Sequence, residues 1–280
     1  MGSYHCPRPL QELTTFLKQY GERRTGTNYL RALLLANYKD VHVLMHVLGD
    51  KHSPPVDLNV HLDGAAHSAE RDWQFVRAAT LAAPAESTRP DDPEQIIYLR
   101  DIADAVAESV RAHRLGYLIS SKHPHTWAAS LARYSGWMTR GPFGPRMRRN
   151  FLGRLANACH LYNQRYRAWL DHHGRFEQRS AIVRYEDLLQ DVSSTLTALE
   201  RKFKLVRLEP ELRALPRKVQ PADWDQDSPD FDTDPFDPTV YSRGDYRRQL
   251  SSQAWKVIDD SIDWSIAGDL GYAREPRGRS

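Results

Sequence analysis

A short loop between two glycines constrains what this chain can fold into more than any other feature. Gly21 and Gly26 are separated by four residues, an extended run from Leu13 to Tyr20 precedes them, and a helical run begins at Thr27. Glycines at both ends allow successive backbone N–H groups to point inward, and the following helix adds the positive end of its dipole. The sequence therefore predicts a strand, a phosphate-binding loop and a helix.

The residue after the second glycine narrows the kind of ligand. A nucleoside-triphosphatase loop has the spacing G-x-x-x-x-G-K-[ST] and requires a lysine at that position. This chain has Thr27 there, but it keeps the hydroxyl of Thr25 and the guanidinium groups of Arg23 and Arg24. A loop without the lysine but with these donors suits a short, highly charged 5′ group of a nucleotide.

Two further segments have the pattern of a buried strand that runs into a helix. In the first, Lys122 follows the strand, Pro124 suits the first helical turn because its missing N–H has no intrahelical acceptor there, and Ser130 comes two turns later. In the second, Ala181 to Asp191, a short apolar strand precedes the run RYEDLL, which contains Tyr185. The acidic residues of this run also have a purely structural explanation, because such residues at a helix start cap the helix and interact favourably with its dipole.

In chain order and spacing, the three junctions resemble those of the sulfotransferases that use PAPS, 3′-phosphoadenosine 5′-phosphosulfate. The loop is similar to the family's 5′-phosphosulfate loop, and the RYEDLL run is similar to a family signature. Lys122 with Ser130 matches the 3′-phosphate signature, although the family usually has arginine first and lysine lacks its planar fork. The run from Tyr241 to Tyr272 is similar to the family's C-terminal helix and tail, so the resemblance extends over most of the chain.

The resemblance implies a set of residues around PAPS and its product PAP, adenosine 3′,5′-bisphosphate. They would contact the 5′-phosphosulfate, the 3′-phosphate or the adenine, and the transfer is expected to need no metal ion. The residues are Arg23, Arg24, Thr25, Gly26, Thr27, Asn28, Lys122, Ser130, Tyr185 and Arg243.

The implied reaction is in-line transfer of the sulfuryl group from PAPS to a hydroxyl or amine of an acceptor. Arg24 is the candidate for stabilising charge on the leaving oxygen, and because a guanidinium keeps its proton it does not act as an acid. His52 is the candidate base, because histidine titrates near neutrality and many family members have a Lys-x-His motif in this region. Glu22, His46 and Asp50 stay open as alternative bases.

The expected fold is α/β, with three layers and a central parallel sheet flanked by helices, the P-loop-NTPase-like architecture of sulfotransferases. We expect a single domain over residues 1–280, which is long enough to bury a substantial core. The predicted strands cover residues 13–20, 41–47, 115–120 and 180–183, and the predicted helices cover 27–37, 102–113, 125–134, 147–172, 192–203 and 251–264. Between residues 50 and 92 we expect long loops that build the acceptor pocket.

The composition limits which kinds of partner we expect for the chain. It has 39 basic and 36 acidic residues and a net charge of +3, which gives no reason to expect nucleic acid. No run approaches the roughly 20 apolar residues of a membrane helix, and Cys6 and Cys159 do not suggest a disulfide framework. We therefore expect a cytoplasmic protein that acts on a small-molecule or glycan acceptor, such as a glycolipid, while its oligomeric state stays open.

Two other functions stay open. The aspartate-rich segment 223–237 would suit a metal-dependent nucleotide-sugar transferase, in which a divalent ion holds the nucleotide. The arginine-rich stretch 140–179 has an apolar stripe at helical spacing and would suit a polyanion-binding module with a vestigial nucleotide site. The metal-dependent enzyme would lose activity when its ion is removed, whereas the binding module would show a steep dependence on salt.

Overall fold

Four parallel strands form the central sheet of the computed structural model, which describes residues 15–39, 41–58, 68–81, 93–135, 145–213 and 249–274. In sheet order they are β3 (Val41–Leu44), β1 (Thr15–Gly21), β4 (Gly116–Ser121) and β5 (Ser180–Arg184). All three pairings are parallel, and Gly21 at the end of β1 lies opposite Ser120 near the end of β4. The predicted parallel sheet is confirmed.

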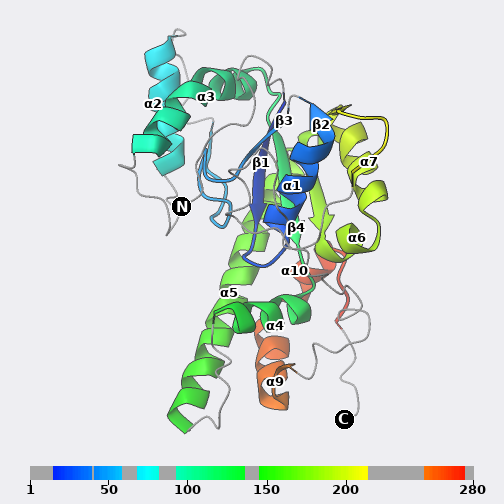
Figure 1. The fold of residues 1–280 in the computed structure, drawn as a ribbon. Coiled ribbons are helices and arrows are strands. Elements are labelled where there is room, and N and C mark those ends of the chain that lie inside the picture. Colours follow the sequence, from blue (N-terminus) through cyan, green and yellow to red (C-terminus); the bar gives the residue numbers. More distant parts are fainter. Residues whose placement is uncertain are drawn as a thin grey trace.

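Helices pack on both faces of the sheet (Figure 1). Side chains alternate along β1, so that Phe16 and Tyr20 join one hydrophobic cluster and Leu17 joins the other. The cluster on the Leu17 face includes side chains of α1 (Thr27–Asn37), α6 (Tyr185–Gln190) and α7 (Val192–Phe203). The opposite cluster includes side chains of α2 (Ala69–Leu81), α3 (Pro93–Arg111), α4 (Pro124–Tyr134), α5 (Pro145–Arg175), α9 (Ser252–Ser261) and α10 (Trp264–Asp269). The predicted three-layer α/β arrangement is therefore confirmed.

The long helix α5 extends past the sheet and packs against α9 (Figure 1). Leu155, Tyr162, Tyr166 and Trp169 lie along one face of α5 and are fully buried. The apolar stripe that the sequence shows in this stretch is thus part of the hydrophobic core. Although α5 has 31 residues, neither it nor any other helix of the described ranges is long and apolar enough to cross a membrane.

The expectation of long loops between residues 50 and 92 was wrong for residues 69–81. They form α2, and its Trp73 and Val76 are buried against the core. A buried charge interrupts the apolar pattern of this helix: Asp72 is 3% exposed and accepts two hydrogen bonds from Arg111 of α3, at 2.5 and 3.0 Å. Such an ion pair between distant residues is not visible in a local sequence pattern.

The C-terminal run also differs from expectation. Residues 252–261 and 264–269 form two helices instead of one, and Asp263 caps the second by accepting a hydrogen bond from the backbone N–H of Ser265. Two shorter pieces complete the described elements: β2 (Tyr38–Lys39) pairs antiparallel with β6 (Val206–Arg207), and a 3₁₀ turn, η3, spans Glu177–Arg179. Arg243 and the aspartate-rich segment 223–237 lie outside the described residues.

The order of the strands determines where a ligand can bind. The chain leaves β1 through α1 on one face to reach β3, and it returns through α2 and α3 on the other face to β4, on the opposite side of β1. In open α/β sheets, ligands bind at such a reversal, beyond the carboxyl ends of the strands. The carboxyl end of β1, where Gly21 lies, is therefore the expected site.

Replacing Leu33 of α1 with alanine should lower the free energy of unfolding by about 2–5 kcal/mol, the usual cost of truncating a buried leucine. Leu33 is 0% exposed, whereas Leu161 on α5 is 45% exposed. The matched Leu161→Ala variant should change that free energy by less than about 0.5 kcal/mol. Urea unfolding followed by circular dichroism measures both, and equal losses would contradict the packing of α1 on the sheet.

Candidate functional site

The loop between β1 and α1 has the backbone shape of an anion-binding nest. Arg24 and Gly26 have left-handed φ angles of 71° and 80°. A left-handed residue that is not glycine costs about 1 kcal/mol, and such residues cluster at functional sites. Gly26 is the N-cap of α1 and has no side chain to cap it, and the first turn contains no acidic residue. The positive end of the helix dipole is thus left for a ligand.

Close contacts require glycine at both ends of this loop. A Cβ atom at Gly21 would lie 2.8 Å from the carbonyl oxygen of Ser120, and one at Gly26 would lie 2.3 Å from a ring carbon of Tyr185. Tyr185 is the first residue of α6 and directly follows β5. The ring of Tyr185, a predicted site residue, therefore packs directly on the loop between β1 and α1.

The loop after β1 meets the segment after β4. The Nε atom of Arg24 donates a long hydrogen bond of 3.5 Å to the hydroxyl of Ser130 in α4. The Nζ atom of Lys122 lies 4.8 Å from the centroid of the Tyr185 ring. Four of the predicted cofactor-binding residues, far apart in sequence, thus come together around Gly26.

Burial lowers the pKa of the Lys122 ammonium to about 7. Its side chain is 1% exposed. Glu186 raises the pKa of Lys122, and the positive charges of Arg24 and Arg133 lower it further. An anion that binds here would favour the charged form of the lysine.

Other predicted loop residues hold the loop in shape. The hydroxyl of Thr25 donates to the carbonyl oxygen of Glu22 at 2.7 Å, and the carbonyl oxygen of Arg23 accepts from the indole N–H of Trp127 at 3.1 Å. Thr27 begins α1, and its carbonyl oxygen accepts from the side chain of Gln19 at 3.0 Å. These contacts fix the loop before any ligand is bound.

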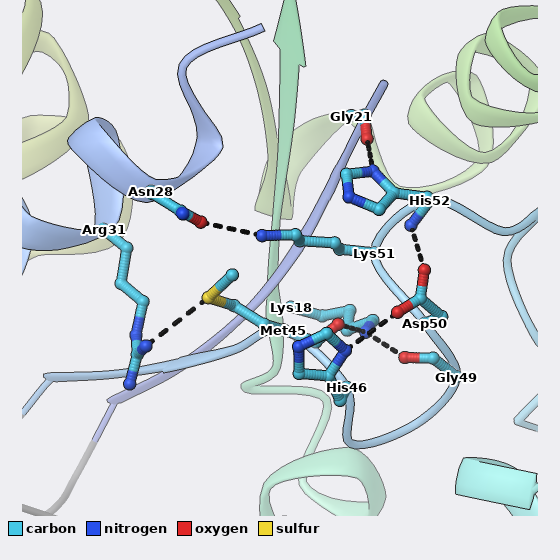
Figure 2. A network of polar contacts seen from close by, with 10 residues as sticks. All are labelled: Lys18, Gly21, Asn28, Arg31, Met45, His46, Gly49, Asp50, Lys51 and His52. Atoms are coloured by element: carbon cyan, nitrogen blue, oxygen red, sulfur yellow. Dashed lines mark hydrogen bonds and ion pairs between the residues drawn. The ribbon is translucent and has the colours of Figure 1, made fainter. Parts of the chain in front are cut away.

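The segment after β3 lies against the other side of the loop (Figure 2). The backbone N–H of Gly21 donates to the carbonyl oxygen of Lys51 at 2.9 Å. The Nζ atom of Lys51 donates to the Oδ1 atom of Asn28 at 2.8 Å, and the Nδ1 atom of His52 lies 2.6 Å from the carbonyl oxygen of Gly21. Lys51 and His52 are therefore fixed beside the start of α1.

Lys51 supplies a positive charge to a loop that has threonine where a nucleoside-triphosphatase has lysine. Its side chain is 6% exposed, and within the described ranges it forms no ion pair. Burial lowers its pKa to about 7, with Asp50 raising it and Arg31 and Arg23 lowering it. Lys51 was not among the predicted site residues, and its position next to His52 was the available signal.

The hydrogen bond of His52 determines its tautomer. A carbonyl oxygen only accepts, so Nδ1 must carry the proton that it donates to Gly21, which leaves the lone pair on Nε2. Burial, and then the charge of Lys51, lower the pKa of His52 to about 3. His52 is therefore neutral near pH 7 and has the form that a proton acceptor needs.

The three alternative bases are each engaged by other side chains. The Oε1 atom of Glu22, which is 4% exposed, accepts from Arg165 at 2.8 Å. The Oδ2 atom of Asp50 accepts from the Nδ1 atom of His46 at 2.8 Å, and its Oδ1 atom accepts from the backbone N–H of His52 at 2.8 Å. Burial alone would raise the pKa of Asp50, but these hydrogen bonds lower it overall. His46 donates through Nδ1 and so keeps the lone pair on Nε2, as His52 does. His52 therefore stays the predicted base, and His46 stays the alternative to it.

A fully buried lysine braces the segment that carries Lys51 and His52. Lys18 lies within β1, is 0% exposed, and donates to the carbonyl oxygens of Met45 and Gly49 at 3.1 and 2.5 Å (Figure 2). Burial lowers its pKa from the ordinary 10.5 to about 7. This role was not predicted, because a lysine within a strand usually faces solvent.

Comparison with known proteins adds a likeness of fold. No protein-family model and no curated protein matches the chain. It is similar to the sulfotransferase domain of the olefin synthase from Synechococcus PCC 7002, with 17% identity and a TM-score of 0.47 over 94% of this chain and 97% of that one. The sulfotransferase domain from the curacin biosynthetic pathway is similar with 14% identity and a TM-score of 0.43, over 94% of this chain and 99% of that one. At such values, function must be argued from the site itself.

Metal binding has no candidate in the described ranges. They contain no group of three or more histidine, cysteine, aspartate or glutamate side chains placed to hold a metal ion. The cations at the carboxyl edge of the sheet are instead arginine and lysine side chains, and the ligand that they suit is an anion.

Lys18 should make the stability of the protein depend on pH. Its pKa is about 7 in the folded protein and 10.5 ordinarily, so the unfolded state holds more protons between these values and stability rises with pH there. This one group should add about 2 kcal/mol to the free energy of unfolding between pH 7 and pH 9. Urea unfolding at the two pH values should show the rise reduced in Lys18→Met but not in Lys256→Met, an exposed control. An unchanged rise in Lys18→Met would contradict the lowered pKa.

Proposed function

We propose that the protein is a sulfotransferase that uses PAPS as donor and transfers its sulfuryl group to a hydroxyl or amine of a small-molecule or glycan acceptor. One observation carries the proposal. Arg24 in the loop after β1 contacts Ser130 in α4, so the segments assigned to the two ends of PAPS adjoin each other. A nucleoside with a charged group at both its 3′ and 5′ positions fits two adjoining cation sites.

In the proposed complex, the 5′-phosphosulfate lies in the loop against the N-terminus of α1, and the 3′-phosphate lies beside Lys122 and Ser130. The Tyr185 ring packs against Gly26 and lies near the Nζ atom of Lys122, which supports a position along the nucleoside between the two groups. Arg23 and Asn28 stay assigned to the 5′ side. Arg243, outside the described residues, stays a predicted contact of the 3′-phosphate.

Transfer requires a base for the acceptor's proton and positive charge near the leaving oxygen. The acceptor oxygen or nitrogen attacks the sulfur, its proton passes to the Nε2 atom of His52, and the bond from sulfur to the bridging oxygen breaks to release PAP. Arg24 keeps its charge throughout and stabilises the negative charge on the released oxygen. Lys51, next to His52 and hydrogen bonded to Asn28, supports the same charge from the other side of the loop.

Calorimetric titration with PAP, ADP and ATP, without metal, tests the donor. PAP has the 3′-phosphate that ADP and ATP lack, so it should bind at least about tenfold more tightly, as expected for added charge-assisted contacts. Addition of EDTA should leave the affinity for PAP unchanged. Preference for ATP, or no binding of PAP, would overturn the proposed function.

Replacing His52 with alanine should abolish turnover and leave the affinity for PAP nearly unchanged, because the ring is assigned to the acceptor's proton and not to the nucleotide. General bases typically contribute about 10²–10⁴-fold to the rate. Release of PAP from PAPS measures turnover, with an acceptor found by screening. His160→Ala, at an exposed position on α5, is the matched control. Normal turnover in His52→Ala would move the base to another residue.

A further inference from the structure

Helix α4 carries a second cation near the proposed 3′-phosphate position. Arg133 lies in the last turn of α4, three residues after Ser130, and residues at this spacing share a helix face. Its side chain is exposed, and within the described ranges it forms no hydrogen bond or ion pair. The positive charge of Arg133 also lowers the pKa of Lys122, with a smaller effect than burial, Glu186 or Arg24.

Positive charge exceeds negative charge at this position. The positive charges of Arg24 and Arg133 lower the pKa of Lys122. Among the described residues, Glu186 is the carboxylate that raises this pKa. Three cations thus face one carboxylate. A phosphate monoester carries about two negative charges near neutral pH, which is the charge that would balance the group.

The oxygens of Glu186 are already used by other donors. Its Oε1 atom accepts from the backbone N–H of His123 at 3.0 Å and from the hydroxyl of Thr126 at 3.2 Å. Its Oε2 atom accepts from the hydroxyl of Tyr272 at 2.8 Å. Glu186 thus accepts from donors within the fold, and within the described ranges it forms no ion pair with Arg133. The donors of the arginine are left for a ligand.

We propose that Arg133 binds the 3′-phosphate of the nucleotide and determines the preference for 3′-phosphorylated nucleotides. The inference rests on the proposed function. Lys122 binds a phosphate as a point charge, whereas a guanidinium presents a planar fork that matches two phosphate oxygens. Arg133 would thus supply from α4 the fork geometry that lysine at position 122 lacks.

A basic residue at the end of a helix has another explanation, because it interacts favourably with the helix dipole. Arg201 provides the matched control for this. It is also exposed and lies in the last turn of its helix, α7, which packs on the other face of the sheet. Arg201→Gln therefore removes the same charge from an equivalent helix position away from α4.

The test is calorimetric titration of the wild type, Arg133→Gln, Arg133→Lys and Arg201→Gln with PAP and with AMP, which lacks the 3′-phosphate. Arg133→Gln should weaken PAP binding by about tenfold or more and leave AMP binding unchanged, as expected for one charge-assisted contact. Arg133→Lys should lose less of the affinity for PAP, and Arg201→Gln should bind both nucleotides as the wild type does. Thermal unfolding confirms that each variant is folded.

Two results would overturn the inference, and they differ from failure of the proposed function. If the wild type prefers PAP and Arg133→Gln keeps that preference, Arg133 does not bind the 3′-phosphate. If Arg133→Gln loses affinity for PAP and for AMP equally, the residue does not determine the preference for 3′-phosphorylated nucleotides. If the wild type itself binds PAP and AMP alike, the proposed donor site fails and the inference fails with it.

Discussion

Positive charge buried beside an uncapped helix N-terminus is the constraint on which this site depends. Lys18, Lys51 and Lys122 are 0%, 6% and 1% exposed, and burial lowers the pKa of each to about 7. A charge removed from water needs hydrogen-bond acceptors or an opposite charge. Backbone carbonyls serve Lys18 and an amide oxygen serves Lys51, and the carboxylate of Asp50 raises the pKa of both lysines. An anion at the loop would add further negative charge beside them.

The positions of Lys18 and of the turn after β3 depend on the register in which β1 pairs with β3. Lys18 lies opposite Leu44, the last residue of β3, and its ammonium reaches the turn that follows. A slip of one residue would turn Lys18 to the other face of the sheet and release that turn. The same turn leads to Asp50, whose carboxylate holds the backbone of His52. The position of His52, the proposed base, is therefore fixed by strand register as well as by local hydrogen bonds.

The sequence predicted the features that a local pattern encodes. Gly21 and Gly26 predict the loop, because a Cβ atom at either position would clash with a neighbouring residue. The apolar runs predict the strands of the sheet. Lys122 follows β4, and it lies at the same edge of the sheet as the loop because β4 pairs with β1. Strand order is a property of the whole chain, which a local pattern does not encode. Lys18 was missed for the same reason, because the carbonyl oxygens that it binds lie 27 and 31 residues further along the chain.

In the proposed reaction, the donor would also prepare the base. The charge of Lys51 is the largest contribution after burial to the low pKa of His52. A phosphosulfate beside Lys51 would offset that charge and would itself favour a protonated imidazole, so both effects raise the pKa of His52. The Nε2 atom would then become a stronger proton acceptor only when the donor is in place. A base that gains strength with donor binding favours transfer to the acceptor over proton uptake by the empty enzyme, because without the donor the pKa of His52 stays at about 3 and the ring stays neutral.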